Sequence, residues 1–170
     1  MLRVIFDTNI YGHLLNEIDA VLLEEKIIAD KEFVIYGYIV IRKELRDVPT
    51  GNKLSRKTRI LLLGLYDRIT EGKLFQDSIA IQHLAKKYYD SFRENGGIYG
   101  WDTSIRVDFM IVACASLQGL DIVYSADKKT LLSKIAKKAY QHINLKENLR
   151  TPNLLAYEDL LLKLRNYSNL

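Results

Sequence analysis

The chain opens with Met1-Leu-Arg-Val-Ile-Phe-Asp-Thr-Asn-Ile10, and this stretch decides the fold. Residues 2–6 are rich in the β-branched and aromatic side chains expected of a buried strand, and Asp7 follows them directly. Open α/β sheets bind ligands just beyond the carboxyl ends of such strands. Asp7 therefore stands where a functional site is expected.

The composition indicates one globular domain that spans 1–170. Its 170 residues are 48% hydrophobic, which is enough for one well-buried core, and they contain no repeat or low-complexity tract. No run approaches the roughly 18 apolar residues of a membrane span, and Arg3 and Asp7 stand where a signal peptide would be apolar. We expect a soluble, cytoplasmic protein. The single cysteine, Cys114, is interpreted as a packing residue.

The charge of the chain is compatible with a polyanionic partner. The formal net charge is +4 and the isoelectric point is about 9.0. Taken singly, each basic cluster is typical of a solvated helix face. The clusters are Arg42, Lys43 and Arg46; Lys53, Arg56, Lys57 and Arg59; and Lys128, Lys129, Lys134, Lys137 and Lys138.

Strand and helix patterns alternate along the chain. Strands are predicted at 2–6, 32–36 and 121–125, with 140–143 as a candidate last strand, and helices at 17–29, 54–71, 78–94, 104–118 and 128–138. A further helix around 41–45 is expected to end before Pro49, although 33–41 also fits one long strand. Helices 54–71 and 78–94 are expected to form a hairpin. The alternation predicts a three-layer α/β/α domain with a central, mostly parallel sheet.

Asp108 is an acid in the most apolar helix of the chain, 104–118. The helix is apolar nearly all round and is therefore expected to be buried. A buried carboxylate is normally ion-paired, hydrogen-bonded or bound to a metal. An ion pair with Arg106 or a lysine is the structural alternative to a functional role for Asp108.

Two further acids fit the same edge of the sheet. Asp127 follows the strand 121–125 and precedes a helix, so it is either a site residue or the N-cap of that helix. Glu44 is either part of the cluster or a solvated helix residue, and Asp7 itself fits a turn or cap. Taken together, the four acids form an oxygen-only set that favours Mg2+ or Mn2+ over zinc. Such a cation among carboxylates suits phosphodiester cleavage.

At this point the chain resembles the PIN-domain ribonucleases, and in particular the VapC-type toxins of toxin–antitoxin pairs. The resemblance covers residues 2 to about 143. It rests on an ordered set of four segments, each with one acid: Val4-Ile-Phe-Asp-Thr-Asn-Ile10, Ile41-Arg-Lys-Glu-Leu45, Val107-Asp-Phe-Met-Ile-Val-Ala-Cys-Ala115 and Ile122-Val-Tyr-Ser-Ala-Asp127. Each motif is unspecific alone, but their order and spacing together match the family.

The resemblance implies a metal-dependent endoribonuclease whose catalytic acids are Asp7, Glu44, Asp108 and Asp127. Asp7, Asp108 and Asp127 would hold Mg2+ or Mn2+, directly or through water, and Glu44 would complete the cluster. The cleaved RNA would carry a 5′-phosphate and a 3′-hydroxyl. Supporting hydrogen bonds are expected from three neighbours of these acids, Thr8 and Asn9 toward Asp7 and Ser125 toward Asp127. Asp121 and Asp102 are alternatives for the fourth acid.

The resemblance also implies partners, which are an RNA substrate, a second copy in a homodimer, and a small antitoxin protein that blocks the acidic site. The stretch 47–103 is longer than in compact family members, and a C-terminal helical extension at about 154–165 follows the core of about 2–143. That extension is expected to pack on the domain or to serve as a contact surface. Tyr88, Tyr89, Tyr99 and Trp101 are either core residues or stack on RNA bases.

Two other classes of function fit parts of the sequence. A catalytically silent PIN-like module would bind RNA or protein, but it has no evident need for four acids. A phosphatase on a similar sheet would need a second aspartate two positions after Asp7, and Asn9 stands there instead. RNA cleavage that requires a divalent cation separates the nuclease from both.

Overall fold

The architecture is a parallel sheet between two groups of helices, in a computed structural model that describes residues 1–48 and 53–166, with backbone only at 53 and 54. The five strands are β1 (Leu2–Phe6), β2 (Phe33–Tyr38), β3 (Leu74–Phe75), β4 (Ile122–Ser125) and β5 (Asn153–Ala156). Their order in the sheet is β3-β2-β1-β4-β5, and all four pairings are parallel. The predicted three-layer α/β/α fold is confirmed.

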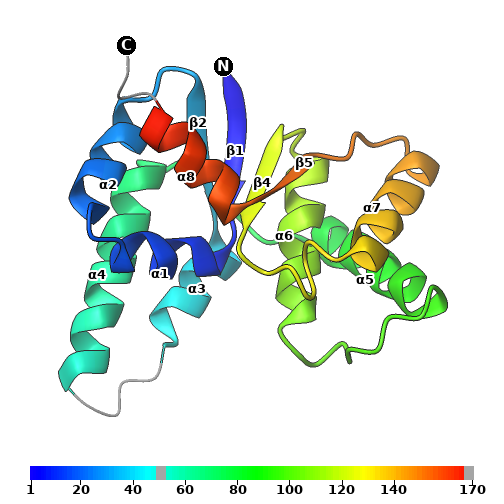
Figure 1. The fold of residues 1–170 in the computed structure, drawn as a ribbon. Coiled ribbons are helices and arrows are strands. Elements are labelled where there is room, and N and C mark those ends of the chain that lie inside the picture. Colours follow the sequence, from blue (N-terminus) through cyan, green and yellow to red (C-terminus); the bar gives the residue numbers. More distant parts are fainter. Residues whose placement is uncertain (49–52, 167–170) are drawn as a thin grey trace.

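The described part of the chain contains eight helices, arranged in two groups. They are α1 (Thr8–Asn16), α2 (Ala20–Ala29), α3 (Ile39–Arg46), α4 (Lys53–Thr70), α5 (Ile79–Glu94), α6 (Ile105–Leu117), α7 (Lys134–Lys146) and α8 (Tyr157–Asn166). Figure 1 shows α1, α2 and α4 on one side of the sheet and α5, α6 and α7 on the other. None of the described helices is both long and apolar enough to cross a membrane.

The central strands are buried because helices cover both of their faces. Val4, Ile5 and Phe6 of β1 have no exposed surface. β1 lies between β2 and β4, with Leu2 opposite Phe33 and Phe6 opposite Tyr124. After β1 the chain forms β2 on one side of β1, and later it forms β4 on the other side. The strand order therefore changes direction between β1 and β4. Ligand sites of open parallel sheets lie at this point, beyond the carboxyl ends of the strands.

Several predicted elements are confirmed with small changes in their bounds. β1, β4, α4, α5 and α6 lie where the periodicity places them, and α6 ends at Leu117, two residues before Gly119, whose φ of 63° suits glycine. The segment after β2 is helix α3, so the long-strand alternative at 33–41 is wrong. α3 ends at Arg46, whereas Pro49 lies outside the described residues.

Other predictions are wrong, each because tertiary contacts decide the structure. Residues 140–143 belong to α7, where the Tyr140 hydroxyl bonds to the carbonyl of Leu131. α7 begins at Lys134 after the cap Ser133, so the helix predicted from Lys128 starts six residues later. α4 and α5 form no hairpin because α4 packs on α1, α2 and α3 whereas α5 packs on α6 and α7.

The predicted helix at 17–29 begins only at Ala20, and a separate helix, α1, precedes it. At the C-terminus, residues 153–156 form β5 rather than helix, and α8 follows at Tyr157. β5 pairs with β4, and α8 packs on α2. Lys26 Nζ donates to the carbonyl of Leu164. The C-terminal segment thus extends the sheet and covers its edge.

Candidate active site

Four acids from four separate segments line one pocket of about 420 Å3. Asp7 follows β1, Glu44 lies in α3, Asp108 in the first turn of α6, and Asp127 follows β4. Thr8, Asn9, Asp47, Val48 and Ser104 also line this pocket. The switch point brings the first and fourth segments together, because the backbone N–H of Asp7 donates to the carbonyl of Tyr124 at 2.9 Å. All four acids predicted from sequence therefore meet in space.

Asp7 is held in a fixed position by its neighbours. It is the N-cap of α1, and its Oδ1 accepts from the backbone N–H of Thr8 at 2.7 Å. Its Oδ2 accepts from the Ser125 hydroxyl at 2.7 Å. Burial raises the pKa of Asp7 to about 6 against the effect of these two bonds, and the charges of Glu44 and Asp127 raise it further.

Asp108 and Asp127 share one hydroxyl group. Thr130 Oγ1 lies 2.7 Å from Asp108 Oδ2 and also contacts Asp127 Oδ2. A hydroxyl has a single proton to donate, so one of the two carboxyls must itself carry a proton for both bonds to form. Burial raises the pKa of Asp108 to about 8, and the charge of Asp7 raises it further. The raised pKa favours the protonated form of Asp108, in which Asp108 donates to the Thr130 hydroxyl.

The sequence analysis missed Thr130, which bonds to two of the acids, and Asp47, a fifth acid in the lining of the pocket. An aspartate side chain commonly accepts from backbone N–H groups two or three residues further on, which predicts a turn after Asp127 but not the bond from the Thr130 hydroxyl to Asp108. The Asp127 carboxylate indeed accepts from the backbone N–H groups of Lys129 and Thr130, both at 2.9 Å. Asp127 thus caps a turn rather than the predicted helix.

Of the three supporting residues named from sequence, Thr8 and Ser125 bond to acids of the cluster through their side chains, whereas Asn9 bonds to the backbone of Ala126 instead of to Asp7. The Thr8 hydroxyl bonds to Glu44, and Asn9 Oδ1 accepts from the backbone N–H of Ala126 at 3.0 Å. Ser125 supports both strand ends, because its hydroxyl donates to Asp7 and accepts from the backbone N–H of Asp127 at 2.9 Å. Burial raises the pKa of Glu44, and the Thr8 bond opposes that shift.

The alternative acids lie elsewhere. Asp121, at the amino end of β4, accepts from the backbone N–H of Arg3 at 2.7 Å and pairs with Arg150 at 2.8 Å. These partners lower the pKa of Asp121. Asp102 is exposed and does not line the pocket. Asp127 is the acid at the carboxyl end.

The electrostatics of the pocket favour a cation. Within 1–48 and 53–166, none of the four acids forms an ion pair. Arg106 lies against Trp101 instead of pairing with Asp108. Mutual repulsion contributes to the raised pKa values of Asp7 and Asp108, and a cation would relieve it.

The donor set fits a hard, hydrated cation by its chemistry. Among the described residues, no three acidic, histidine or cysteine side chains are arranged as a complete metal site. Mg2+ commonly keeps several waters and uses only one or two carboxylates. The Thr130 hydroxyl lies between Asp108 and Asp127. For both carboxylates to bind the cation directly, their hydrogen bonds to this hydroxyl must change.

We predict that Thr130→Val weakens Mn2+ binding about 10- to 100-fold, the usual effect of removing a partner that orients a metal ligand. The substitution removes the hydroxyl that fixes Asp108 and Asp127. Calorimetric titration with MnCl2 measures the change. Thr70→Val is the matched control, because Thr70 is also buried but bonds only to the carbonyl of Tyr66. Equal losses in both variants would contradict an orienting role for Thr130.

The fold is shared with a known structure. No protein-family model matches the chain, and no curated protein matches it in sequence. Among solved structures, the chain is similar to a chain of VapBC2 from Rickettsia felis, crystallised bound to a DNA fragment from their promoter. The TM-score is 0.60 at 14% identity, over 91% of this chain and 98% of the other. Such a likeness establishes the PIN-like fold.

Proposed function

We propose that this chain is a divalent-cation-dependent endoribonuclease, and that it acts as the toxin of a toxin–antitoxin pair. The observation that carries the proposal is the convergence of four unpaired acids on one pocket at the switch point of a PIN-like sheet. A binding module needs no such cluster, since repulsion between buried carboxylates opposes folding. A nuclease uses it to hold Mg2+ or Mn2+.

Asp7, Asp108 and Asp127 would hold the cation, directly or through water, with Glu44 completing the cluster. When bound, the cation would orient water and stabilise the negative charge that develops on the phosphate. In the reaction, water adds to phosphorus and the bond to the 3′ oxygen breaks, which leaves a 5′-phosphate and a 3′-hydroxyl. Ser125 and Thr8 keep the Asp7 and Glu44 carboxylates directed at the pocket.

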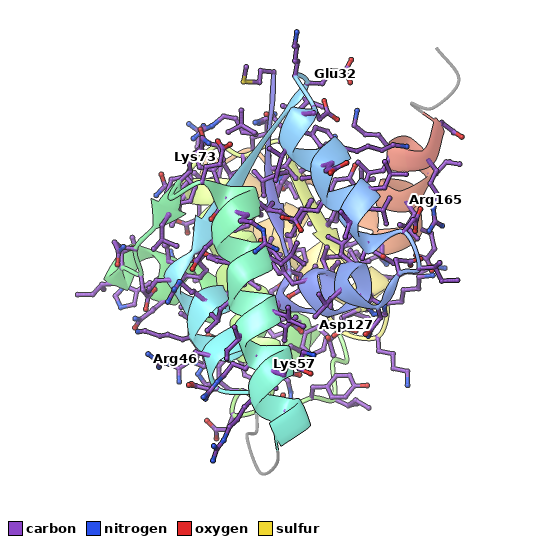
Figure 2. All side chains as sticks on the ribbon, turned by 90° about the vertical axis from the view of Figure 1, so that its left-hand side faces the viewer. Glu32, Arg46, Lys57, Lys73, Asp127 and Arg165 are labelled. Atoms are coloured by element: carbon purple, nitrogen blue, oxygen red, sulfur yellow. The ribbon has the colours of Figure 1, made fainter. Side chains whose placement is uncertain are left out.

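Basic side chains of α3 and α4 would assist the binding of a polyanion. Asp47 and Val48, at the end of α3, line the pocket, and exposed basic side chains of α3 and α4 lie nearby in the chain: Lys43, Arg46, Arg56 and Lys57. Figure 2 shows Arg46, Lys57 and Asp127 in the lower half of the molecule, whereas Glu32 and Lys73 lie at the opposite end. Cations beside an acidic centre would hold the phosphates on either side of the cleaved bond.

A small antitoxin is proposed as the protein partner. The similar structure is a VapBC2 assembly bound to promoter DNA, which is compatible with such a partner for this chain. We also propose a homodimer, a cytoplasmic location and an RNA substrate. Co-expression with the neighbouring reading frame, followed by affinity purification, tests the antitoxin.

The test of the activity is cleavage of total RNA by the purified protein in Mg2+ or Mn2+. We expect cleavage that EDTA stops and that added Mn2+ restores, with 5′-phosphate ends that allow ligation of an adaptor. Cleavage that persists in EDTA would contradict the proposal. RNA binding without cleavage in either cation would instead support a silent PIN-like module.

Added Mg2+ or Mn2+ is predicted to raise the melting temperature. At a hundredfold excess over the Kd the stabilisation is about 2.7 kcal/mol, or roughly 5–10 °C for a domain of this size. The shift should be larger at pH 8 than at pH 6, because the cation must displace the proton from Asp108, whose pKa is raised to about 8. Differential scanning fluorimetry at both pH values checks this. A shift that is independent of pH would place the cation elsewhere.

A further inference from the structure

A pair of half-buried aromatic rings precedes, along the chain, the start of α6 that lines the acidic pocket. Tyr89 belongs to α5, and Trp101 belongs to the segment 95–104 that joins α5 to α6. Their ring centroids are 5.1 Å apart at an interplanar angle of 52°. The segment leads to Ser104, which lines the pocket, and into the helix of Asp108. Figure 1 shows the start of α6 at the end of the molecule where β1 terminates.

Cationic side chains lie over both rings. Lys86 Nζ is 4.7 Å from the centroid of Tyr89 and 5.4 Å from that of Trp101, and the guanidinium of Arg106 is 5.8 Å from Trp101. Lys86 also pairs with Asp90. Within the described chain, Arg106 forms no ion pair, so its charge is available to an anion beside the indole.

The segment that carries Trp101 is anchored to α5. The backbone N–H of Gly97 donates to the carbonyl of Phe92 at 2.9 Å, and a Cβ on Gly97 would lie 2.2 Å from the Phe92 ring. Arg93 donates to the carbonyl of Tyr99 at 3.3 Å. Tyr99 itself is 37% exposed. The aromatic pair is thus held in place, and both of its rings keep part of their surface exposed.

We propose that Tyr89 and Trp101, with Lys86 and Arg106, form a stacking platform for an unpaired base of the substrate, which selects single-stranded RNA. The proposal rests on the proposed nuclease function and names the form of its substrate. Aromatic faces stack on unpaired bases of any sequence, and neighbouring cations hold the backbone phosphates. Bases inside an A-form duplex are already stacked, so a duplex leaves the platform unused.

The platform carries its own reporter, because Trp101 is the only tryptophan in the chain. We expect single-stranded RNA, titrated in EDTA to prevent cleavage, to quench the tryptophan emission saturably. A duplex of the same sequence and an abasic oligonucleotide of the same length should leave the emission unchanged. The abasic oligonucleotide presents the same phosphates without bases, so it separates stacking from charge.

Substitutions test the same contact by fluorescence anisotropy of labelled RNA. Trp101→Leu should weaken binding of single-stranded RNA about tenfold, whereas Trp101→Phe, which keeps a stacking face, should retain most of the affinity. Tyr36→Leu is the matched control. Tyr36 is half-buried, stacks on Phe75 and has the guanidinium of Arg3 over its ring, but it belongs to β2 and not to the segment that leads into α6.

Equal quenching by RNA and the abasic oligonucleotide, or equal affinities of the wild type and Trp101→Leu, would overturn the platform. Quenching by a polyglutamate peptide but not by RNA would also overturn it and would assign the surface to a protein partner. Cleavage of RNA in Mn2+ without quenching of the tryptophan emission in EDTA would contradict the stacking platform but not the proposed nuclease function. Quenching of the tryptophan emission by RNA, with no cleavage in Mn2+ or Mg2+, would contradict the proposed nuclease function but not the stacking platform.

Discussion

Asp7→Asn is expected to lower the rate of RNA cleavage by more than about a hundredfold, because loss of a residue that merely orients a metal ligand already lowers activity 10- to 100-fold. Asp7 is the most enclosed acid of the cluster, with 3% of its surface exposed and both carboxylate oxygens engaged by neighbours. The amide keeps the size of the side chain but has one oxygen and no charge. Its nitrogen would also oppose the cation.

The initial rate of cleavage of a labelled RNA, with the variant and the wild type at equal concentration, measures this effect. Asp121→Asn is the matched control, since Asp121 lies at the opposite end of β4 and pairs with Arg150. It should cleave like the wild type. Circular dichroism would establish that both variants are folded. Undiminished cleavage by Asp7→Asn would show that Asp7 is not part of the active site. An equal loss of cleavage rate in Asp121→Asn would indicate a general loss of structure.

Asp108→Asn is expected to stabilise the cation-free protein by about 2 kcal/mol at pH 7 while it abolishes cleavage. The folded-state pKa of about 8 lies above the ordinary value of 3.8. At pH 7 the ionisation of Asp108 lowers the free energy of the unfolded chain but not that of the folded chain. The increase in the free energy of unfolding that the substitution produces is therefore at most about 4 kcal/mol. The neutral amide removes this difference.

The pH dependence of unfolding has a definite sign. The folded state binds the Asp108 proton more tightly than the unfolded state does. The contribution of this proton to the free energy of unfolding is therefore fully present below about pH 4 and is lost as the pH rises through about 8. Urea unfolding of the wild type in EDTA should therefore show a component that declines over this range. In Asp108→Asn that component should be missing. A variant less stable than the wild type at pH 7 would contradict a buried, cation-free carboxyl at this position.

The central strands and the buried helix were predictable because burial on both sides leaves a strong sequence pattern. β1 contains the apolar run 4–6 and β4 the apolar run 122–124, and α6 is apolar nearly all round, so their bounds fell within a few residues of the prediction. The short edge strands β3 and β5 were missed. β5 is only four residues long, and its Leu154 and Leu155 also fit the stripe of the helix that follows.

Tertiary contacts explain the other differences. Residues 140–143 have strand-like composition, but Ser133 caps a helix that includes them, and the Tyr140 ring packs against Phe109 with a centroid separation of 5.4 Å. Helix α1 contains Gly12 and begins on Thr8-Asn9, which is weak helical sequence. Its start is fixed by the Asp7 cap, and Asp7 had been considered chiefly as a site residue.

The convergence of the acids was predictable from the sheet, whereas their hydrogen bonds were not. Asp7 and Asp127 follow strands that a parallel sheet brings to the same edge. The sequence could not show that Ser125 would bond to Asp7, or that Thr130 would lie between Asp108 and Asp127. Those contacts depend on the path of the turn after β4, which only the packed structure defines.

The most direct test of the account is Mn2+ binding to the purified protein, followed by electron paramagnetic resonance. We predict saturable binding at pH 8 that Mg2+ competes away, that is much weaker at pH 6, and that is lost in both Asp7→Asn and Asp108→Asn but kept in Asp121→Asn. A wild-type protein that is folded and binds no Mn2+, or one whose Mn2+ binding survives both substitutions, would contradict the claim that the four acids form the cation centre.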